Sequence, residues 1–197
     1  MAKITVKKTI NSISPKNRQQ WRKWLQANHD KKESVWLIYH KKSSKTPSMS
    51  WSDAVEEALC FGWIDSKRQA VDATTFRQFF SKRKARSLWS GINKAKVQQL
   101  ISGGLMTRLG FEAIENAKKN GSWTTLDEVE KLTIPADLDI AFRKIKNAKK
   151  YFLSLSRSNK RIMLQWVALA KRPETRQKRI DEIAKLAGQN SKPKQFE

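Results

Sequence analysis

The hydrophobic positions of the first half of the chain change period several times, which predicts helices alternating with strands. Residues 1–13 alternate weakly and predict a short edge strand or a loose arm. A Ser-Pro pair then opens a helical pattern over 14–28, with tryptophans at helical spacing. The run SVWLIYHK (34–41) is apolar at both parities, so we expect a strand covered on both faces.

The middle of the first half predicts one helix followed by more strands. Ser50 is a good N-cap, and the apolar stripe that follows it ends at Gly62. The period then changes, and residues 63–65 and 75–80 have the composition of extended segments. Together with 34–41, these segments predict a small antiparallel or mixed sheet of roughly three or four strands.

The rest of the chain predicts helices without strands. We expect one helix after Ser90, with Ile92 facing inward, and another opened by Thr107. The acidic segment 122–135 is the candidate boundary between two halves. Beyond it the expected helices are 136–145, 147–155, 158–171 and 174–187. The sequence therefore predicts an α+β, predominantly helical protein: an α+β domain over 1–130, a helical basic domain over 136–188 and a disordered tail over 189–197.

Composition narrows the class of protein. With 39% hydrophobic residues and eight tryptophans, 197 residues can bury a core without disulfides. Cys60 is the single cysteine and the histidines number two, so no metal site and no internal disulfide are expected. The N-terminal segment lacks the apolar stretch of a secretory signal, and no run is long enough to span a membrane. We expect a cytoplasmic protein.

Positive charge is the strongest global feature, and it is concentrated in the second half. The chain has 41 Lys and Arg against 18 Asp and Glu, a net charge of +23. Between Ile140 and Ile180 stand thirteen basic residues and one acidic residue, Glu174. Such a field favours association with a polyanion such as nucleic acid. The alternative is an ordinary solvated helical face.

Two of these cations fall on the side of a helix that should be buried. On a helix starting at Pro173, a rotation of about 100° per residue places Arg176 and Arg179 beside Ile180. Lys171 and Arg172 come just before the helix, whose N-terminus also attracts anions. The group suits a phosphate, sulfate or carboxylate. Alternatively, the guanidinium groups pair with an internal carboxylate, with three candidates at this stage: Asp65, Asp72 and Glu174.

The stretch ALCFGWIDSKRQ (58–69) combines a cysteine, an aromatic cluster, an acid and two cations. Cys60 follows an apolar helical stripe and is best interpreted as a small core residue. Trp63 is interpreted as core as well. Asp65 follows a buried aromatic run, so it must be solvated at an edge or paired, and it can cap a turn, orient an arginine or contact a ligand.

The stretch SKRKARSLWSGIN (81–93) offers a capped helix N-terminus next to cations, which fits either phosphate binding or an ordinary N-cap. No glycine-rich phosphate loop, paired-carboxylate signature, nucleophile elbow or zinc motif occurs. The sequence therefore predicts no catalytic residues and no cofactor, and it favours a binding protein over an enzyme.

Several stretches together resemble the YdeI/OmpD-associated family, also described as bacteriocin-protection proteins. The stretches are WLIYHKK (36–42), DAVEEALCFGWIDSK (53–67), SLWSGIN (87–93), LISGGLMTRLG (100–110), NGSW (120–123) and AKRPETRQKRI (170–180). The resemblance implies protection against cationic antimicrobial peptides or bacteriocins, a link to an outer-membrane porin and a periplasmic location. This sequence departs from that picture, because it has no secretory signal and its charge repels a cationic peptide.

The motif positions suggest one site drawn from both halves. We expect polar groups to converge on a cleft between the halves, with Asp65 holding Arg176 or Arg179 and a tryptophan lining the wall. The candidate ligand-binding residues are Lys171, Arg172, Arg176, Arg179, Asp65, Ser66, Trp63, Ser87, Trp89, Ser90 and Asn93.

Three functions remain open at this stage. The first is a non-enzymatic basic module that binds nucleic acid or another polyanion, and the second is an enzyme or binder that holds a small anionic ligand in the cleft. The third is a protein-interaction role, for which tryptophans exposed on one face would mark the partner site.

Overall fold

The chain folds into two compact units, as a computed structural model that describes residues 11–41, 43–44 and 46–196 shows. The first unit comprises Met1–Ser87 and Ile92–Ser122, and the second comprises Leu88–Gly91 and Trp123–Glu197. Most of the expected edge strand lies outside the described residues, and its described part is the two-residue strand β1 (Ser12–Ile13).

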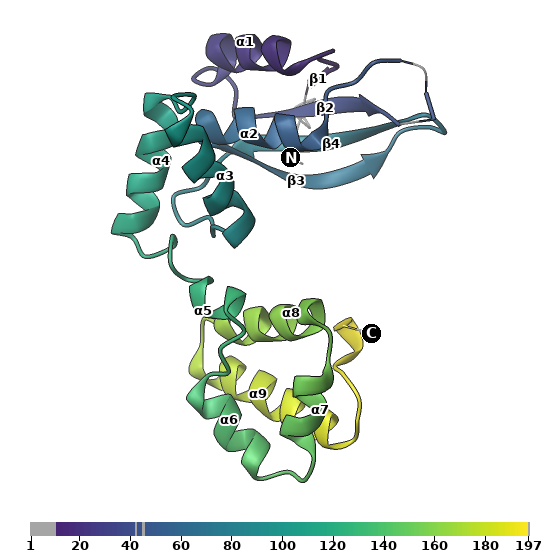
Figure 1. The fold of residues 1–197 in the computed structure, drawn as a ribbon, viewed down its shortest axis with the longest axis vertical. Coiled ribbons are helices and arrows are strands. Elements are labelled where there is room, and N and C mark those ends of the chain that lie inside the picture. The colour runs from purple at the N-terminus through teal and green to yellow at the C-terminus, as the bar shows by residue number, and fades with distance from the viewer. Residues whose placement is uncertain (1–10, 42, 45, 197) are drawn as a thin grey trace, which may run out of the picture. The chain divides into compact units, whose positions relative to one another are not determined.

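A four-stranded mixed sheet forms the centre of the first unit (Figure 1). Its order is β1, β2 (Ser34–His40), β4 (Thr75–Lys82) and β3 (Trp63–Ala70). The β1–β2 pair is parallel, and the other two pairs are antiparallel. Of the residues that the structure describes, 52% are helical and 14% are in strands, which confirms the α+β, predominantly helical prediction.

One face of the sheet is covered by two helices. Helix α2 (Trp51–Cys60) begins after Ser50, whose hydroxyl accepts a hydrogen bond from the Asp53 amide, as the sequence predicted. Helix α1 (Arg18–Asn28) places Trp21 5.6 Å from the ring of Phe80 in β4. The Trp21 indole N–H also donates to the Ala54 carbonyl at 3.0 Å, so one side chain joins both helices to the sheet.

Helix α1 starts later than its proline suggested. Its N-cap is Asn17, whose side chain accepts a hydrogen bond from the Gln20 amide at 3.0 Å. Ser14 lies outside the helix, and its hydroxyl donates to the Ile38 carbonyl at 3.5 Å. The expected start at Ser14 is therefore wrong, because asparagine caps a helix as well as serine and here stands one turn further on.

Helices α3 (Gly91–Ser102) and α4 (Arg108–Lys119) begin directly after Ser90 and Thr107, as predicted. The expected inward position of Ile92 is wrong, since 69% of it is exposed. The buried stripe of α3 runs through Val97, and a residue five positions earlier is turned by about 140° away from it.

A buried carboxylate joins α1 to α2. Glu57 is only 2% exposed and lies on the same stripe of α2 as Ala54 and Ala58. It binds the side chain of Arg18 and accepts a hydrogen bond from Arg22 at 2.6 Å. Burial alone would lower the pKa of both guanidinium groups, but the hydrogen bonds to Glu57 raise it.

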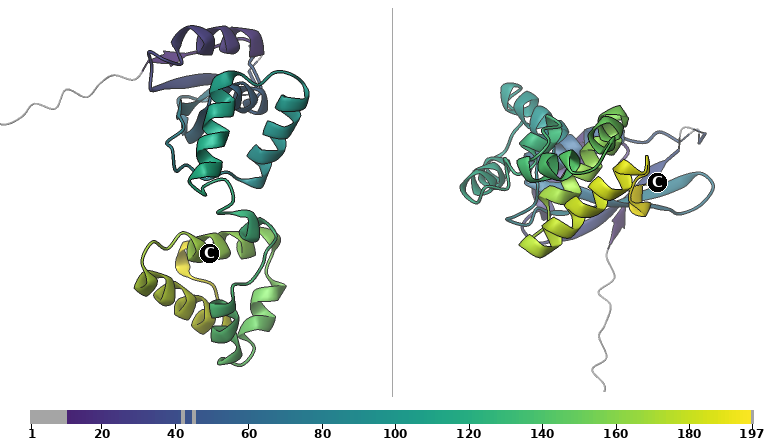
Figure 2. Two further views of the ribbon diagram at one scale, coloured as in Figure 1. Left: turned by 90° about the vertical axis from the view of Figure 1, so that its left-hand side faces the viewer. Right: turned by 90° about the horizontal axis from the view of Figure 1, so that it is seen from below.

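The second unit is a bundle of five helices, which Figure 2 shows in green and yellow around their common core. They are α5 (Asp127–Glu130), α6 (Ala136–Arg143), α7 (Ala148–Ser154), α8 (Arg157–Ala168) and α9 (Pro173–Gly188). Fully buried side chains from α6 to α9 fill the core, among them Leu138, Phe152, Leu164 and Ile183. The sequence predicted the last four helices and missed α5, which is a single turn.

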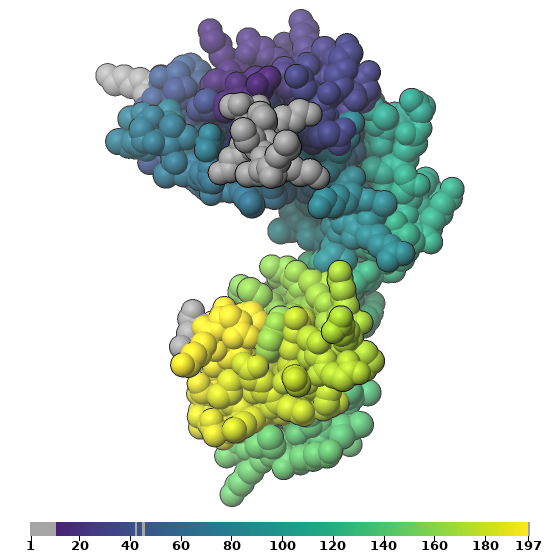
Figure 3. Space-filling model, turned by 180° about the vertical axis from the view of Figure 1, so that it is seen from behind, coloured from purple at the N-terminus to yellow at the C-terminus, as the bar shows by residue number. Residues whose placement is uncertain are grey.

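The C-terminal segment is ordered where the sequence predicted a disordered tail. A 3-10 helix, η1, spans Lys194–Phe196, and the Phe196 ring lies 5.5 Å from Trp166 of α8 in an edge-on contact. Figure 3 shows this yellow segment lying against the helical unit. The composition is polar, but the Phe196 side chain is partly buried against the core of the helical unit, which favours this position of the segment.

The main division between the units lies between Ser122 and Trp123, at the start of the acidic segment 122–135, so α5 belongs to the second unit. The second unit also takes Leu88–Gly91 from the middle of the first unit's sequence, which the sequence did not predict. Trp89 in that segment is 1% exposed, and its ring lies 5.0 Å from the ring of Trp123. The chain thus passes between the units three times.

Candidate anion-binding surface

The cations at the start of α9 divide into an exposed group and a half-buried group. Lys171, Arg172 and Lys178 are exposed. Arg176 and Arg179 are half-buried and lie on the side of the helix that buries Ile180, which confirms their predicted orientation. Pro173 occupies the first turn, where its missing N–H costs nothing.

Arg176 is occupied by contacts within its own unit. Its Nε and Nη2 atoms donate to the two carboxylate oxygens of Asp137 in α6 at 2.7 and 3.0 Å, and Nη1 donates to the Val167 carbonyl of α8 at 3.2 Å. The hydrogen bond from Arg176 lowers the pKa of Asp137. This fork-shaped pair links three helices, so its first role is structural.

The carboxylate that binds Arg176 is thus none of the three that the sequence offered. Asp137 stands 39 positions earlier in the chain, at the start of α6. Sequence spacing could place Arg176 on the buried side of a helix but could not identify the carboxylate opposite it. The pairing of Asp65 with Arg176 is replaced by this local pair.

Arg179 also makes contacts inside the helical unit. Its Nη1 donates to the Trp166 carbonyl of α8 at 2.5 Å, and its guanidinium lies 5.0 Å from the centre of the Trp166 ring. A cation over an indole face is stabilised by the ring's negative face. Arg176 and Arg179 therefore hold α9 against α6 and α8, and the groups free to meet a ligand at this end of α9 are Lys171, Arg172 and Lys178.

Few carboxylates neutralise the basic half. Of the thirteen cations between Ile140 and Ile180, four form ion pairs with described residues: Arg143 and Lys149 with Asp139, Arg161 with Glu130 and Arg176 with Asp137. The other nine form none within the described part of the chain; they are Lys144, Lys146, Lys150, Arg157, Lys160, Lys171, Arg172, Lys178 and Arg179.

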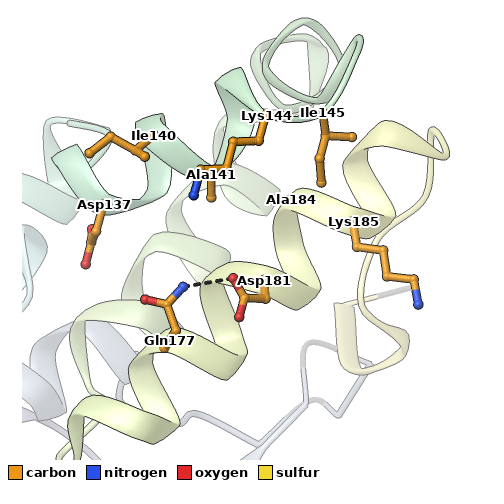
Figure 4. A pocket seen from close by; sticks show the side chains of 9 residues that line it. All are labelled: Asp137, Ile140, Ala141, Lys144, Ile145, Gln177, Asp181, Ala184 and Lys185. Atoms are coloured by element: carbon orange, nitrogen blue, oxygen red, sulfur yellow. Dashed lines mark hydrogen bonds between the residues drawn. The ribbon is translucent and has the colours of Figure 1, made fainter.

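A pocket of about 530 Å³ lies between α6 and α9 (Figure 4). Its polar lining is mixed in charge, with Asp137 and Asp181 facing it alongside Lys144 and Lys185. Gln177 donates to Asp181 at 2.8 Å across one end of it. Because acids and bases are balanced here, the positive field of the unit comes from its exposed helical surface and not from this pocket.

The candidates Trp63, Asp65 and Ser66 lie on strand β3 of the first unit. Asp65 is half-buried near the start of β3, and one of its oxygens, Oδ2, accepts hydrogen bonds from the Trp51 indole at 2.9 Å and the Gln78 amide at 3.0 Å. Ser66 follows and is exposed. Trp63 is 1% exposed and packs edge-on against Trp24 at 5.9 Å, so it is a core residue.

The SLWSGIN segment is shared between the units. Ser87 and Asn93 belong to the first unit, whereas Trp89 and Ser90 belong to the second. Trp89 is fully buried, which makes it a core residue and not the wall of a ligand site. Convergence of these groups on one cleft stays a prediction.

Cysteine reactivity, metal binding and membrane insertion are the remaining possibilities to consider. Cys60 is fully buried, and burial raises the pKa of its thiol, as expected for a core residue. Within the residues that the structure describes, no group of three or more His, Cys, Asp or Glu side chains could hold a metal ion. No helix in that same part of the chain has both the length and the apolar character needed to cross a bilayer.

Two family models match the chain. Residues 13–113, about half of the chain, match the model described as Domain of unknown function (DUF8412). Residues 131–190 match the model described as Bacteriocin-protection, YdeI or OmpD-Associated. The chain therefore belongs to the proteins that carry a DUF8412 domain, and its residues 131–190 match the YdeI/OmpD-associated family. No curated protein and no solved structure gives a significant match.

The two matches divide the motifs of the chain between them. The AKRPETR run, with Arg176 and its partner Asp137, lies in the YdeI/OmpD-associated part, which comprises helices of the second unit. The CFGWIDS segment and Asp65 lie in the DUF8412 part. The family resemblance is confirmed over 131–190, which contains AKRPETRQKRI, whereas the other stretches that suggested it lie outside that range.

Four residues that bind the charged groups described above were not predicted from the sequence. Trp51 and Gln78 hold Asp65, and nothing in their local patterns sets them apart. Asp137 is one of several acids near α6. Glu57 had a usable signal, because it stands three residues after Ala54 and one before Ala58 and so falls on the buried stripe of α2.

Proposed function

We propose that this YdeI/OmpD-associated protein binds polyanions through the exposed cations of its helical unit, with nucleic acid as the first polyanion to test. The observation that supports the proposal is the surplus described above: nine of the thirteen cations between Ile140 and Ile180 have no ion-pair partner among the described residues. Unpaired surface cations can release the counterions of a polyanion when they meet its phosphates.

The carboxylates of the unit are placed where they serve the fold. Asp139 binds two cations, at 2.6 Å each, and Asp137 binds Arg176. These acids stabilise helix contacts, and the exposed side chains of Lys171, Arg172 and Lys178 form no ion pair within the described part of the chain. The exposed start of α9 is therefore the part of the surface on which the proposal is most sharply testable.

The proposal needs no catalytic step, and a cytoplasmic location is part of it. The matched family model names bacteriocin protection in its description. A chain with a net charge of +23 repels a cationic peptide, so direct capture of such a peptide does not fit this protein. We propose that any protective role proceeds through its binding to a polyanion.

Fluorescence anisotropy with labelled single- and double-stranded nucleic acid, measured over a series of salt concentrations, tests the proposal. Binding should weaken steeply with salt. The double variant Lys171→Gln/Arg172→Gln should weaken binding and reduce the slope of log K against log salt by about two, at roughly 0.9 for each phosphate that is no longer neutralised. Both side chains are exposed, so the fold should be unaffected.

A charge-matched control separates a site from net charge. Lys31→Gln/Lys32→Gln removes the same two charges from exposed positions of the first unit. Equal weakening in the two double variants would mean that net charge alone drives binding, and the proposed surface would be rejected. Absence of binding at physiological salt would reject the proposal as a whole and leave the positive charge as solvation of the helical surface.

A further inference from the structure

The first unit contains a pocket of about 300 Å³ at the edge of the covered sheet face, within the lower range of small-ligand sites. It is lined by Trp51 at the start of α2, Asp65 and Arg68 of β3, and Phe76 and Gln78 of β4. All five residues belong to the first unit, so this pocket is independent of the polyanion surface proposed above.

A β-bulge brings the acid and the base of this pocket together. Residues three positions apart in a regular strand point to opposite faces. Asp65 pairs with Phe80 and Arg68 pairs with Gln78, so two residues of β3 stand opposite Phe79 alone. The extra residue turns Arg68 onto the same face as Asp65, which is a recognised use of a bulge.

The acid and the base share the pocket without forming an ion pair. The Oδ2 atom of Asp65 accepts from Trp51 and Gln78, while Oδ1 has no hydrogen-bond partner among the described residues. The Arg68 guanidinium lies 3.9 Å over the Phe76 ring and makes no ion pair or hydrogen bond with a described residue. One unpaired acceptor and one unpaired set of donors therefore line the same small space.

Two aromatic groups give the pocket an apolar wall. Trp51 is 49% exposed, and its indole N–H donates to Asp65, so an indole face remains open to solvent. Phe76 stacks on Tyr39 at 5.0 Å, which fixes its ring. The Tyr39 hydroxyl is itself buried without a hydrogen-bond partner in the described structure, near enough to Asp65 to feel its charge.

These features select among ligand classes. Arg68 opposes a simple cation in this pocket, and Asp65 opposes a simple anion. A neutral aromatic molecule would cover both charges without pairing either, which is costly. A small molecule that carries an ammonium and a carboxylate next to an apolar group can pair with both Asp65 and Arg68 and also contact the aromatic wall.

We propose that this pocket binds a small zwitterion of the amino-acid type. The ammonium group donates to Asp65 Oδ1, the carboxylate accepts from the Arg68 guanidinium, and the side chain lies against Trp51. The Trp51–Asp65 hydrogen bond holds both the acid and the indole in position before the ligand arrives. The chemistry is recognition only, and no bond is made or broken.

Nuclear magnetic resonance titration of the full-length protein tests this assignment. The indole N–H signal of Trp51, identified by its loss in Trp51→Phe, reports directly on Asp65. L-phenylalanine, L-leucine and L-tryptophan are titrated to about 10 mM, which covers weak small-ligand binding. At least one of them should shift this signal saturably. For L-phenylalanine, the matched analogues phenethylamine and 3-phenylpropionate should bind at least about tenfold more weakly, since each lacks one charged contact.

Variants of the two charged residues give the decisive pattern. Asp65→Asn should remove the advantage of the zwitterion over 3-phenylpropionate, and Arg68→Gln should remove its advantage over phenethylamine. Lys67→Gln removes one charge from an exposed neighbouring position of β3 and should leave the titration unchanged. Because Arg68 is exposed, Arg68→Gln should fold normally even if Asp65→Asn does not.

Three results would overturn the assignment. The first is the absence of any saturable shift with the three amino acids. The second is equal binding of L-phenylalanine and one of its single-charge analogues. The third is a response to Asp65→Asn without any response to Arg68→Gln, which would point to a ligand with donors only, such as a simple amine. None of these results bears on polyanion binding by the second unit.

Discussion

The buried carboxylate between α1 and α2 gives the sharpest test of how the first unit is held together. We consider Glu57→Gln, which keeps the shape of the side chain and removes its charge. Glu57 is 2% exposed and binds both Arg18 and Arg22. The variant leaves two guanidinium groups without their main carboxylate, in a place where water reaches only part of them.

The expected destabilisation follows from the burial of the three side chains. Breaking a fully buried pair by removing one partner costs about 3–5 kcal/mol. Here the side chains of Arg18 and Arg22 are 33% and 27% exposed, and Arg18 keeps a contact to Glu56 at 2.8 Å. Solvent and the second acid compensate part of this cost, so we expect the free energy of unfolding to fall by about 2–3 kcal/mol.

Thermal unfolding combined with hydrogen exchange measures this destabilisation. For a domain of about 100 residues, a decrease of 1 kcal/mol lowers Tm by about 4–8 °C, so the first unit should melt at least about 8 °C earlier. The amides of α1 and α2 should exchange faster. Glu115→Gln is the control, since Glu115 is exposed and pairs only with Lys118 at 2.8 Å on the surface. If Glu57→Gln unfolds at the same temperature as Glu115→Gln, the reasoning from burial is refuted.

Three further changes test separate parts of the fold. Trp89→Ala should cost about 3–5 kcal/mol and speed amide exchange in the second unit, and faster exchange confined to the first unit would contradict the assignment of Leu88–Gly91. Gly110→Ala should cost about 1–3 kcal/mol, because its Cβ would stand 2.6 Å from the Cys60 carbonyl oxygen, whereas Gly91→Ala has room and should melt normally. Asp137→Asn should lower Tm at pH 7. The difference in Tm between the variant and the unmodified protein should shrink as the pH falls through the lowered pKa of Asp137, because the Asp137–Arg176 pair is stabilising only while the carboxylate is charged. A difference that stays unchanged down to pH 2 would contradict this.

Local patterns were sufficient for most elements of the fold. Ser50 starts α2, Thr107 precedes α4 and Pro173 opens α9, each for a reason that a few neighbouring residues contain. The apolar residues at both parities of 34–41 predicted β2, because this strand buries side chains on both of its faces. Helical spacing also predicted which side of α9 carries Arg176.

The rest depends on contacts between residues far apart in sequence. The partner of Arg176 stands 39 positions away, and no spacing rule singles out Asp137. The bulge of β3 arises from its pairing with β4, so the sequence of β3 alone does not show that Arg68 joins Asp65. Phe196 stands in a polar segment, and its contact with Trp166, 30 positions earlier, cannot be read from that segment.

The passage of Leu88–Gly91 into the second unit limits how this protein can be taken apart and how it can have been assembled. The DUF8412 match contains this segment, although its tryptophan belongs to the other unit, where its ring contacts Trp123. During synthesis Trp89 leaves the ribosome before the helices of the unit to which it belongs. A gene fragment that begins at Trp123 would leave this side chain behind, so exchange of the helical unit between proteins requires two joined pieces of sequence instead of one.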